Sequence, residues 1–131
     1  MSLDSRLLEY VVNEESYSDG QEIFAEGSSG EWIYIVLEGR VKIRKKTKKG
    51  ALAIVTLKEG AIFGELVFLQ MTQGKRTASV VAVGDVNVGI LDTRRITTEL
   101  NQVSPMLRKL IGKLAERLQE ATEKLARVSI Q

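Results

Sequence analysis

The sequence predicts a mainly β domain, a sandwich or barrel, that is followed by helices at its C-terminal end. Between residues 20 and 92, short apolar runs alternate with glycines, which gives a turn about every ten residues. After residue 92 the hydrophobic pattern takes the period of a helix. A chain of 131 residues fits one domain, so we expect an N-terminal helical segment (1–19), a β region (20–92) and C-terminal helices (93–131).

The elements of the first two segments follow from local patterns. A short helical piece is expected within residues 2–12, and the clearest strands are 32–37, 41–45, 52–57, 77–83 and 86–91. In the second strand, Val41 and Ile43 alternate with Lys42 and Arg44, which is the period of a half-buried strand. Gly39 lies between the first two strands, where a tight turn through LEGR would use the backbone freedom of glycine.

Two helices are predicted after the β region. The first covers residues 93–102, and Ser104 and Pro105 supply an N-cap and a first-turn proline for a longer one. On the longer helix, apolar residues recur at alternating spacings of four and three, a heptad pattern that we call the seam: Leu107, Ile111, Leu114, Leu118, Ala121, Leu125 and Val128. This stripe is narrower than the face of a core-packed helix, so we expect a parallel homodimer through residues 107–125. The alternative is that the seam packs on its own β domain.

The composition excludes several classes of protein. The chain has no cysteine and no histidine, which removes disulfides, thiol catalysis, the usual zinc sites and histidine acid/base chemistry. With 44% apolar and 27% charged residues it has the balance of a globular protein, and no apolar run approaches the ~20 residues of a membrane span. We therefore expect a cytoplasmic binding module without a metal, a catalytic residue or a membrane partner.

The positive charge is concentrated in one place. Five of the 19 cations lie within residues 44–49, and the rest of the chain is net negative. No aromatic residue lies among them to stack on bases, and Gly50 follows directly. The pattern favours a solvated hairpin tip, so this domain alone is not expected to bind nucleic acid. A DNA-associating regulator that uses the hairpin is the weaker alternative.

The segment IFGELVFLQMTQGKRTASV, residues 62–80, holds two charges in apolar surroundings. Burying Glu65 or Arg76 without a partner would cost several kcal/mol, so something must meet them. A helical turn at 66–69 after Gly64 leaves free N–H groups for an anion, the Arg76 fork fits phosphate oxygens, and Thr77 adds a hydroxyl and an N–H. A carboxylate for sugar hydroxyls, an arginine for a phosphate and apolar walls for a base together indicate a nucleotide.

These motifs resemble one family over nearly the whole chain. EGSSGEWIYIVLEGRVKI, then FGEL, then RTA and a long helix are similar to the cyclic nucleotide-binding domain, in the form of the catabolite activator regulatory domain. The resemblance implies a β-roll, a jelly-roll barrel with short flanking helices and a long dimerisation helix. It assigns Glu65 to the ribose and Arg76 to the phosphate. The remaining residues implied for this cassette are Gly64, Leu66, Thr77 and Ala78.

The long helix extends the resemblance. RLQEATEK, residues 117–124, is similar to the dimer helix of the activator family, where an arginine at the position of Arg117 supports the ribose end and a residue at the position of Thr122 reaches the base from the partner subunit. The heptad places Arg117 and Thr122 beside the seam, which would let Thr122 reach across a dimer. Ala121 stands where the family has a second hydroxyl.

The resemblance implies a regulatory sensor domain rather than an enzyme. It would bind a 3′,5′-cyclic nucleotide, with cyclic AMP favoured over cyclic GMP, and would transmit the signal through its C-terminal helices. Thr77 is the kind of residue that favours cyclic GMP in eukaryotic relatives, so the base stays open. A ligand-free β-roll that serves as a dimerisation or scaffold module is the main alternative. With three residues after Val128, we expect either a regulatory fragment or a stand-alone sensor.

Overall fold

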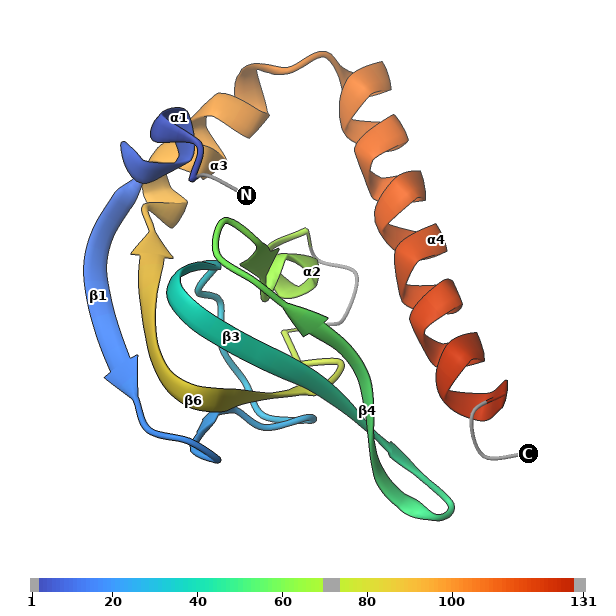
Figure 1. The fold of residues 1–131 in the computed structure, drawn as a ribbon. Helices are drawn as coiled ribbons and strands as arrows, with labels where there is room; N and C mark the ends of the chain where they lie inside the picture. Colours follow the sequence, from blue (N-terminus) through green and yellow to red (C-terminus); the bar gives the residue numbers. More distant parts are fainter. Residues whose placement is uncertain (1–2, 70–73, 129–131) are drawn as a thin grey trace.

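The computed structural model describes residues 3–69 and 74–128. One six-stranded antiparallel sheet, with the order β1-β6-β3-β4, curls around a common interior, and α4 runs along one side of it (Figure 1). Strand β2 pairs with β6 and strand β5 pairs with β3. The elements are α1 (Ser5–Leu8), β1 (Val11–Tyr17), β2 (Glu22–Phe24), β3 (Tyr34–Thr47), β4 (Gly50–Leu57), β5 (Ile62–Phe63), α2 (Glu65–Phe68), β6 (Ser79–Leu91), α3 (Thr93–Gln102) and α4 (Pro105–Val128). The predicted mainly β fold with C-terminal helices is confirmed.

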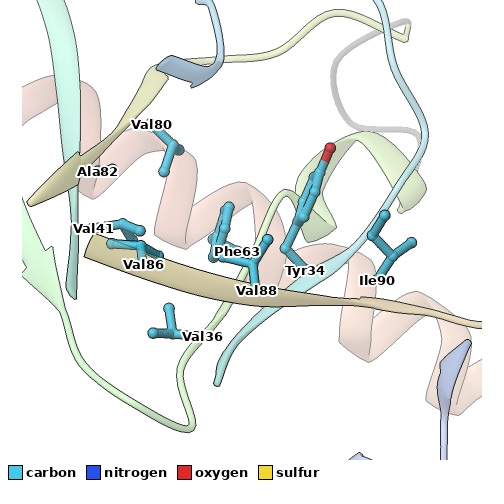
Figure 2. Packing of buried hydrophobic residues seen from close by; sticks show 9 residues of the cluster. All are labelled: Tyr34, Val36, Val41, Phe63, Val80, Ala82, Val86, Val88 and Ile90. Atoms are coloured by element: carbon cyan, nitrogen blue, oxygen red, sulfur yellow. The ribbon is translucent and has the colours of Figure 1, made fainter. Parts of the chain in front are cut away.

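The main core lies inside the curled sheet. Figure 2 shows its side chains converging from β3, β5 and β6. The rings of Tyr34 and Phe63 stack with centroids 5.0 Å apart, and Val36 and Val88 are completely buried. A second cluster of Ile33, Ile35 and Leu91 lies under the N-terminal residues and α3. The alternation of strand residues fills the interior, as the sequence pattern predicts.

The N-terminal segment differs from the prediction. Among the described residues of this segment, Ser5–Leu8 alone is helical, and the expected helical region is a strand from Val11, since β1 (Val11–Tyr17) pairs antiparallel with β6. Most side chains of β1 are exposed, so the segment shows no clear apolar alternation in the sequence. Its stability comes from backbone hydrogen bonds to β6, from Val11 opposite Leu91 to Tyr17 opposite Val86.

Gly39 is not the tight turn that LEGR suggested. Strand β3 continues through it, and its register against β6 shifts between Val36 and Glu38 and again between Glu38 and Arg40, which marks a bulge. Its φ is +86°, and a Cβ placed there would lie 2.4 Å from the Asp85 carbonyl oxygen. The predicted strands 77–83 and 86–91 are likewise one strand, β6, which passes through Gly84 at φ +68°. Glycines with positive φ bend these strands without ending them.

The C-terminal helices follow the prediction. Helix α3 begins and ends as expected, and the Leu107 N–H donates to Ser104 Oγ at 3.2 Å, which caps α4. Helix α4 packs on the β domain through a face that includes Ala115 and Ala126, which are buried. The seam is largely exposed: its six large members are 36–53% exposed, and of these Leu118 also lines a cavity of the β domain. Most of the seam therefore does not cover its own β domain. Among the described residues, no helix is both long and apolar enough to cross a membrane.

Candidate functional site

A cavity of about 350 Å³ lies between β3 and β4, the α2 turn, the start of β6 and helix α4. It brings together predicted site residues that are far apart in the sequence: Gly64, Glu65, Leu66, Arg76, Thr77, Ala78 and Thr122. Arg117 is exposed and is not part of the lining, because it lies on another face of α4. Of the loop between α2 and Arg76, residues 70–73 lie outside the described residues.

Arg76 is the most deeply buried charged group of the cavity, with 4% exposure. Its Nη1 donates to the Gly64 carbonyl oxygen and its Nη2 to that of Trp32, both at 3.1 Å, and the guanidinium lies 4.2 Å from the centroid of the Phe24 ring. The Nε has no hydrogen-bond partner among the described residues. Burial lowers the pKa of Arg76, although an arginine stays charged under ordinary conditions. The group therefore carries a charge that its surroundings satisfy only in part.

The local backbone fixes where Arg76 points. Its N–H donates to the Ser28 carbonyl oxygen and its carbonyl accepts from the Gly27 N–H, both at 2.8 Å. Two glycines leave space for the guanidinium: a Cβ on Gly30 would lie 2.9 Å from Nη2, and one on Gly64 would lie 2.8 Å from Nη1. The sequence indicated Gly30 as a turn residue. Its contact with an arginine 46 positions later could not be found from local pattern.

Glu65 is the first residue of α2, which follows Gly64 at φ +83°. The side chain is half-buried and lines the cavity. Burial raises the pKa of the Glu65 carboxyl, and its own backbone N–H opposes this shift in part. A carboxylate that has lost water in this way gains from a ligand that donates hydrogen bonds to it.

Helix α4 closes one side of the cavity of its own chain. Leu118, Gln119, Thr122 and Glu123 line it, and the Thr122 hydroxyl donates to the Leu118 carbonyl oxygen at 3.0 Å. The sequence pattern suggested that Thr122 would serve a partner subunit. In the structure the face of α4 that packs on the β domain includes Thr122, so this side chain is available to the cavity without a second chain.

Lys45 is a cavity residue that sequence reasoning missed. It was assigned to the solvated hairpin tip, yet it lines the cavity, its Nζ donates to the Thr77 carbonyl oxygen, and the same Nζ lies 3.7 Å from Glu26 Oε2. The sequence did contain a sign of this inward position, because Lys45 lies two residues after Ile43 and four after Val41, on the same face of β3.

The other walls of the cavity are mostly apolar. They come from β3, β4, β5 and β6, and the side chains are Ile43, Val55, Leu57, Ile62, Phe63 and Val80. Such a cavity, apolar with a few placed charges, is typical of a small-molecule site. Within the described residues, no cluster of three or more acidic side chains could hold a metal ion.

Comparison with known proteins agrees with this geometry. The family model for the cyclic nucleotide-binding domain matches residues 14–102. The cyclic AMP receptor protein of Thermus thermophilus is 30% identical over 116 residues, which cover 88% of this chain and 53% of that protein. The cyclic nucleotide-gated channel beta-1 of Homo sapiens is 34% identical over 112 residues, which cover 82% of this chain and 9% of the channel. The chain thus spans about half or less of the length of these relatives.

Solved structures show the same relation. The cAMP-bound form of the EAL enzyme Bd1971 has a TM-score of 0.77 at 29% identity, over 90% of this chain and 31% of that one. Its cGMP-bound form has a TM-score of 0.73 at 30% identity, over 86% and 30%. The catabolite activator protein of Thermus thermophilus has a TM-score of 0.68 at 29% identity, over 95% and 58%. The resemblance inferred from the motifs is confirmed, and the chain belongs to the cyclic nucleotide-binding domain family.

Proposed function

We propose that this chain is a regulatory sensor that binds one 3′,5′-cyclic nucleotide, with cyclic AMP preferred over cyclic GMP, in the cavity beneath α4. The observation that carries the proposal is the meeting of opposite charges in one apolar cavity. A buried guanidinium whose Nε has no hydrogen-bond partner among the described residues lies in the same cavity as a half-buried carboxylate whose pKa is raised. The phosphate of a cyclic nucleotide would supply hydrogen-bond acceptors to the guanidinium, and its ribose would supply a hydroxyl donor to the carboxylate.

The phosphate end is assigned to Arg76 and Thr77. A buried hydrogen-bond donor without a partner costs free energy, and more so on a charged group. A phosphate oxygen would satisfy the guanidinium with charge-assisted hydrogen bonds, and the neighbouring Thr77 offers a hydroxyl on the same wall. The backbone pairing of Arg76 to Ser28 and Gly27 keeps the side chain in place before ligand arrives.

The ribose and base are assigned to the rest of the lining. Glu65 would accept a hydrogen bond from the ribose 2′-hydroxyl, which relieves the loss of water that raises the pKa of its carboxyl. The apolar side chains of β3 and β4 would cover the base on one side, and Gln119 and Thr122 of α4 offer polar atoms on another. The preference for cyclic AMP draws support from the cyclic AMP receptor protein among the relatives.

The C-terminal helix is proposed as both the output and the dimer contact. The partner would be a second copy of this chain, because the exposed apolar residues repeat with the heptad period of a two-stranded coiled coil. A nucleotide held against Gln119 and Thr122 would favour one placement of α4 over others. Couplings between linked sites are typically ~1–3 kcal/mol. In a dimer Arg117 would lie beside the seam, where it could still approach the ribose end.

The test is an isothermal titration of nucleotide-stripped protein with cyclic AMP, repeated with cyclic GMP and with 5′-AMP as a control without the cyclic phosphate. We expect one site per chain, a dissociation constant in the micromolar range or below, tighter binding of cyclic AMP than of cyclic GMP, and weak binding of 5′-AMP. No heat with either cyclic nucleotide, in protein that circular dichroism shows to be folded, would refute the sensor function and would favour the scaffold module.

A further inference from the structure

We propose that Lys45 is a positioning residue of the nucleotide site, which holds the peptide between Thr77 and Ala78 in place for ligand binding. The inference rests on the proposed function and adds a residue that neither the motifs nor the family resemblance assign. Lys45 belongs to a run of cations that the sequence places on an exposed hairpin, so its contacts inside the molecule need an explanation of their own.

The first step is that Lys45 points inward while the hairpin tip does not. Its side chain is 16% exposed, whereas Lys46, Lys48 and Lys49 lie on the surface. Strand period two places Lys45 in one row with Val41 and Ile43, and Val41 is completely buried. Sending an ammonium group along this row carries a desolvation cost, which its contacts must offset.

Those contacts join three separate segments. The Nζ of Lys45 donates to the Thr77 carbonyl oxygen and lies 3.7 Å from Glu26 Oε2. Glu26 is itself held, since its Oε1 accepts from the Lys46 N–H at 2.9 Å and its N–H donates to Ser79 Oγ at 2.9 Å. One ammonium group therefore connects the hairpin, the loop that holds Glu26 and the segment just before β6.

The connection ends at the wall where the phosphate is assigned. Thr77 directly follows Arg76, and Thr77 and Ala78 both line the cavity. Because the peptide bond is planar, fixing the Thr77 carbonyl also fixes the plane of the Thr77–Ala78 peptide and the direction of the Ala78 N–H. Without Lys45, the Thr77 carbonyl would lose its charged donor and the Ala78 N–H would lose its fixed direction. Binding would then have to order this wall, which weakens affinity.

The experiment compares Lys45→Met with Lys46→Met, a change of the adjacent, exposed lysine. Each protein is titrated with cyclic AMP, and the melting temperature of the ligand-free protein is recorded. We expect Lys45→Met to weaken cyclic AMP binding about tenfold, as the loss of one charge-assisted hydrogen bond implies. Lys46→Met should change it less than twofold. A lower melting temperature with unchanged affinity would show a purely structural role and overturn the inference.

The variant Lys45→Gln tests the route of the effect, because it removes the charge and keeps an N–H donor for the Thr77 carbonyl oxygen. If Lys45 acts by holding the Thr77–Ala78 peptide, Lys45→Gln should bind cyclic AMP within about threefold of the wild type. An affinity as low as that of Lys45→Met would mean that Lys45 acts on the ligand through its charge, which contradicts a positioning role. Wild-type protein that binds neither cyclic nucleotide would refute the proposed function and the inference together. If the wild type binds cyclic AMP and Lys45→Met binds it with the same affinity, the inference is refuted while the proposed function stands.

Discussion

Replacing Arg76 by alanine removes the charged donor around which the proposed site is built. In the ligand-bound protein two charge-assisted hydrogen bonds would be lost, each worth ~1.5–3 kcal/mol. Even ~3 kcal/mol in total corresponds to about a hundredfold loss of affinity, since each 1.4 kcal/mol is about tenfold. The fold also depends on this side chain, because the carbonyl oxygens of Gly64 and Trp32 would lose their donors. We expect this loss to lower the free energy of unfolding by ~1–3 kcal/mol.

Two measurements separate these effects. Isothermal titration with cyclic AMP gives the affinity, and urea unfolding of the ligand-free protein gives the stability. Arg76→Lys keeps the charge but not the planar fork, so it should bind with intermediate affinity. Arg40→Ala, on the exposed side of β3 and away from the cavity, is the matched control and should bind as the wild type does. A folded Arg76→Ala protein whose affinity lies within threefold of the wild type would refute the assignment of Arg76 to the phosphate.

Three further changes test other parts of the molecule. Burial raises the pKa of the Glu65 carboxyl, so its contribution to stability is full below about pH 4.5 and is lost as the pH rises through the folded-state pKa. Glu65→Gln should remove this loss of stability, and wild-type and variant urea-unfolding profiles that run parallel against pH would contradict the assignment. Leu114→Glu charges the half-exposed seam and should give a monomer in analytical ultracentrifugation, whereas an unchanged dimer mass would disprove the seam contact. Gly39→Ala drives a Cβ into the Asp85 carbonyl, so it should lower stability by at least about 1 kcal/mol more than Gly20→Ala. Gly20 has a similar φ, and a Cβ there would meet no described atom within 4 Å beyond its chain neighbours; equal urea midpoints would argue against the clash.

The parts of the fold that the sequence predicted are those set by local signals. Ser104 and Pro105 mark the start of α4, and the cations before Gly50 mark the β3–β4 hairpin, whose tip pairs Thr47 with Gly50. These features need only neighbouring residues to form. The presence of Glu65 and Arg76 in one cavity was also predicted, because two charges in an apolar segment need a common partner, such as a ligand, to offset their desolvation cost.

The parts that the sequence did not predict depend on distant partners. Strand β1 is stabilised by the backbone of β6, so its own side chains carry little pattern. Gly39 lies in a sequence that is typical of a turn, but the pairing of β3 with the neighbouring strand β6 makes the chain continue as a bulge. Lys45 was counted with its charged neighbours, whereas its place inside the molecule depends on Glu26 and Thr77, which are 19 residues before it and 32 after it.

Leu118 lies where the two proposed roles of α4 meet. It belongs to the exposed seam, and it also lines the cavity beside Thr122. A helix is stiff on the length scale of one turn, so a partner helix packed on Leu118 would constrain the wall that covers the base. A ligand shifts such an equilibrium only by the difference in its affinity for the two placements of α4. The seam and the cavity are therefore suited to influence each other in both directions, because binding at one changes the affinity of the other by the same factor.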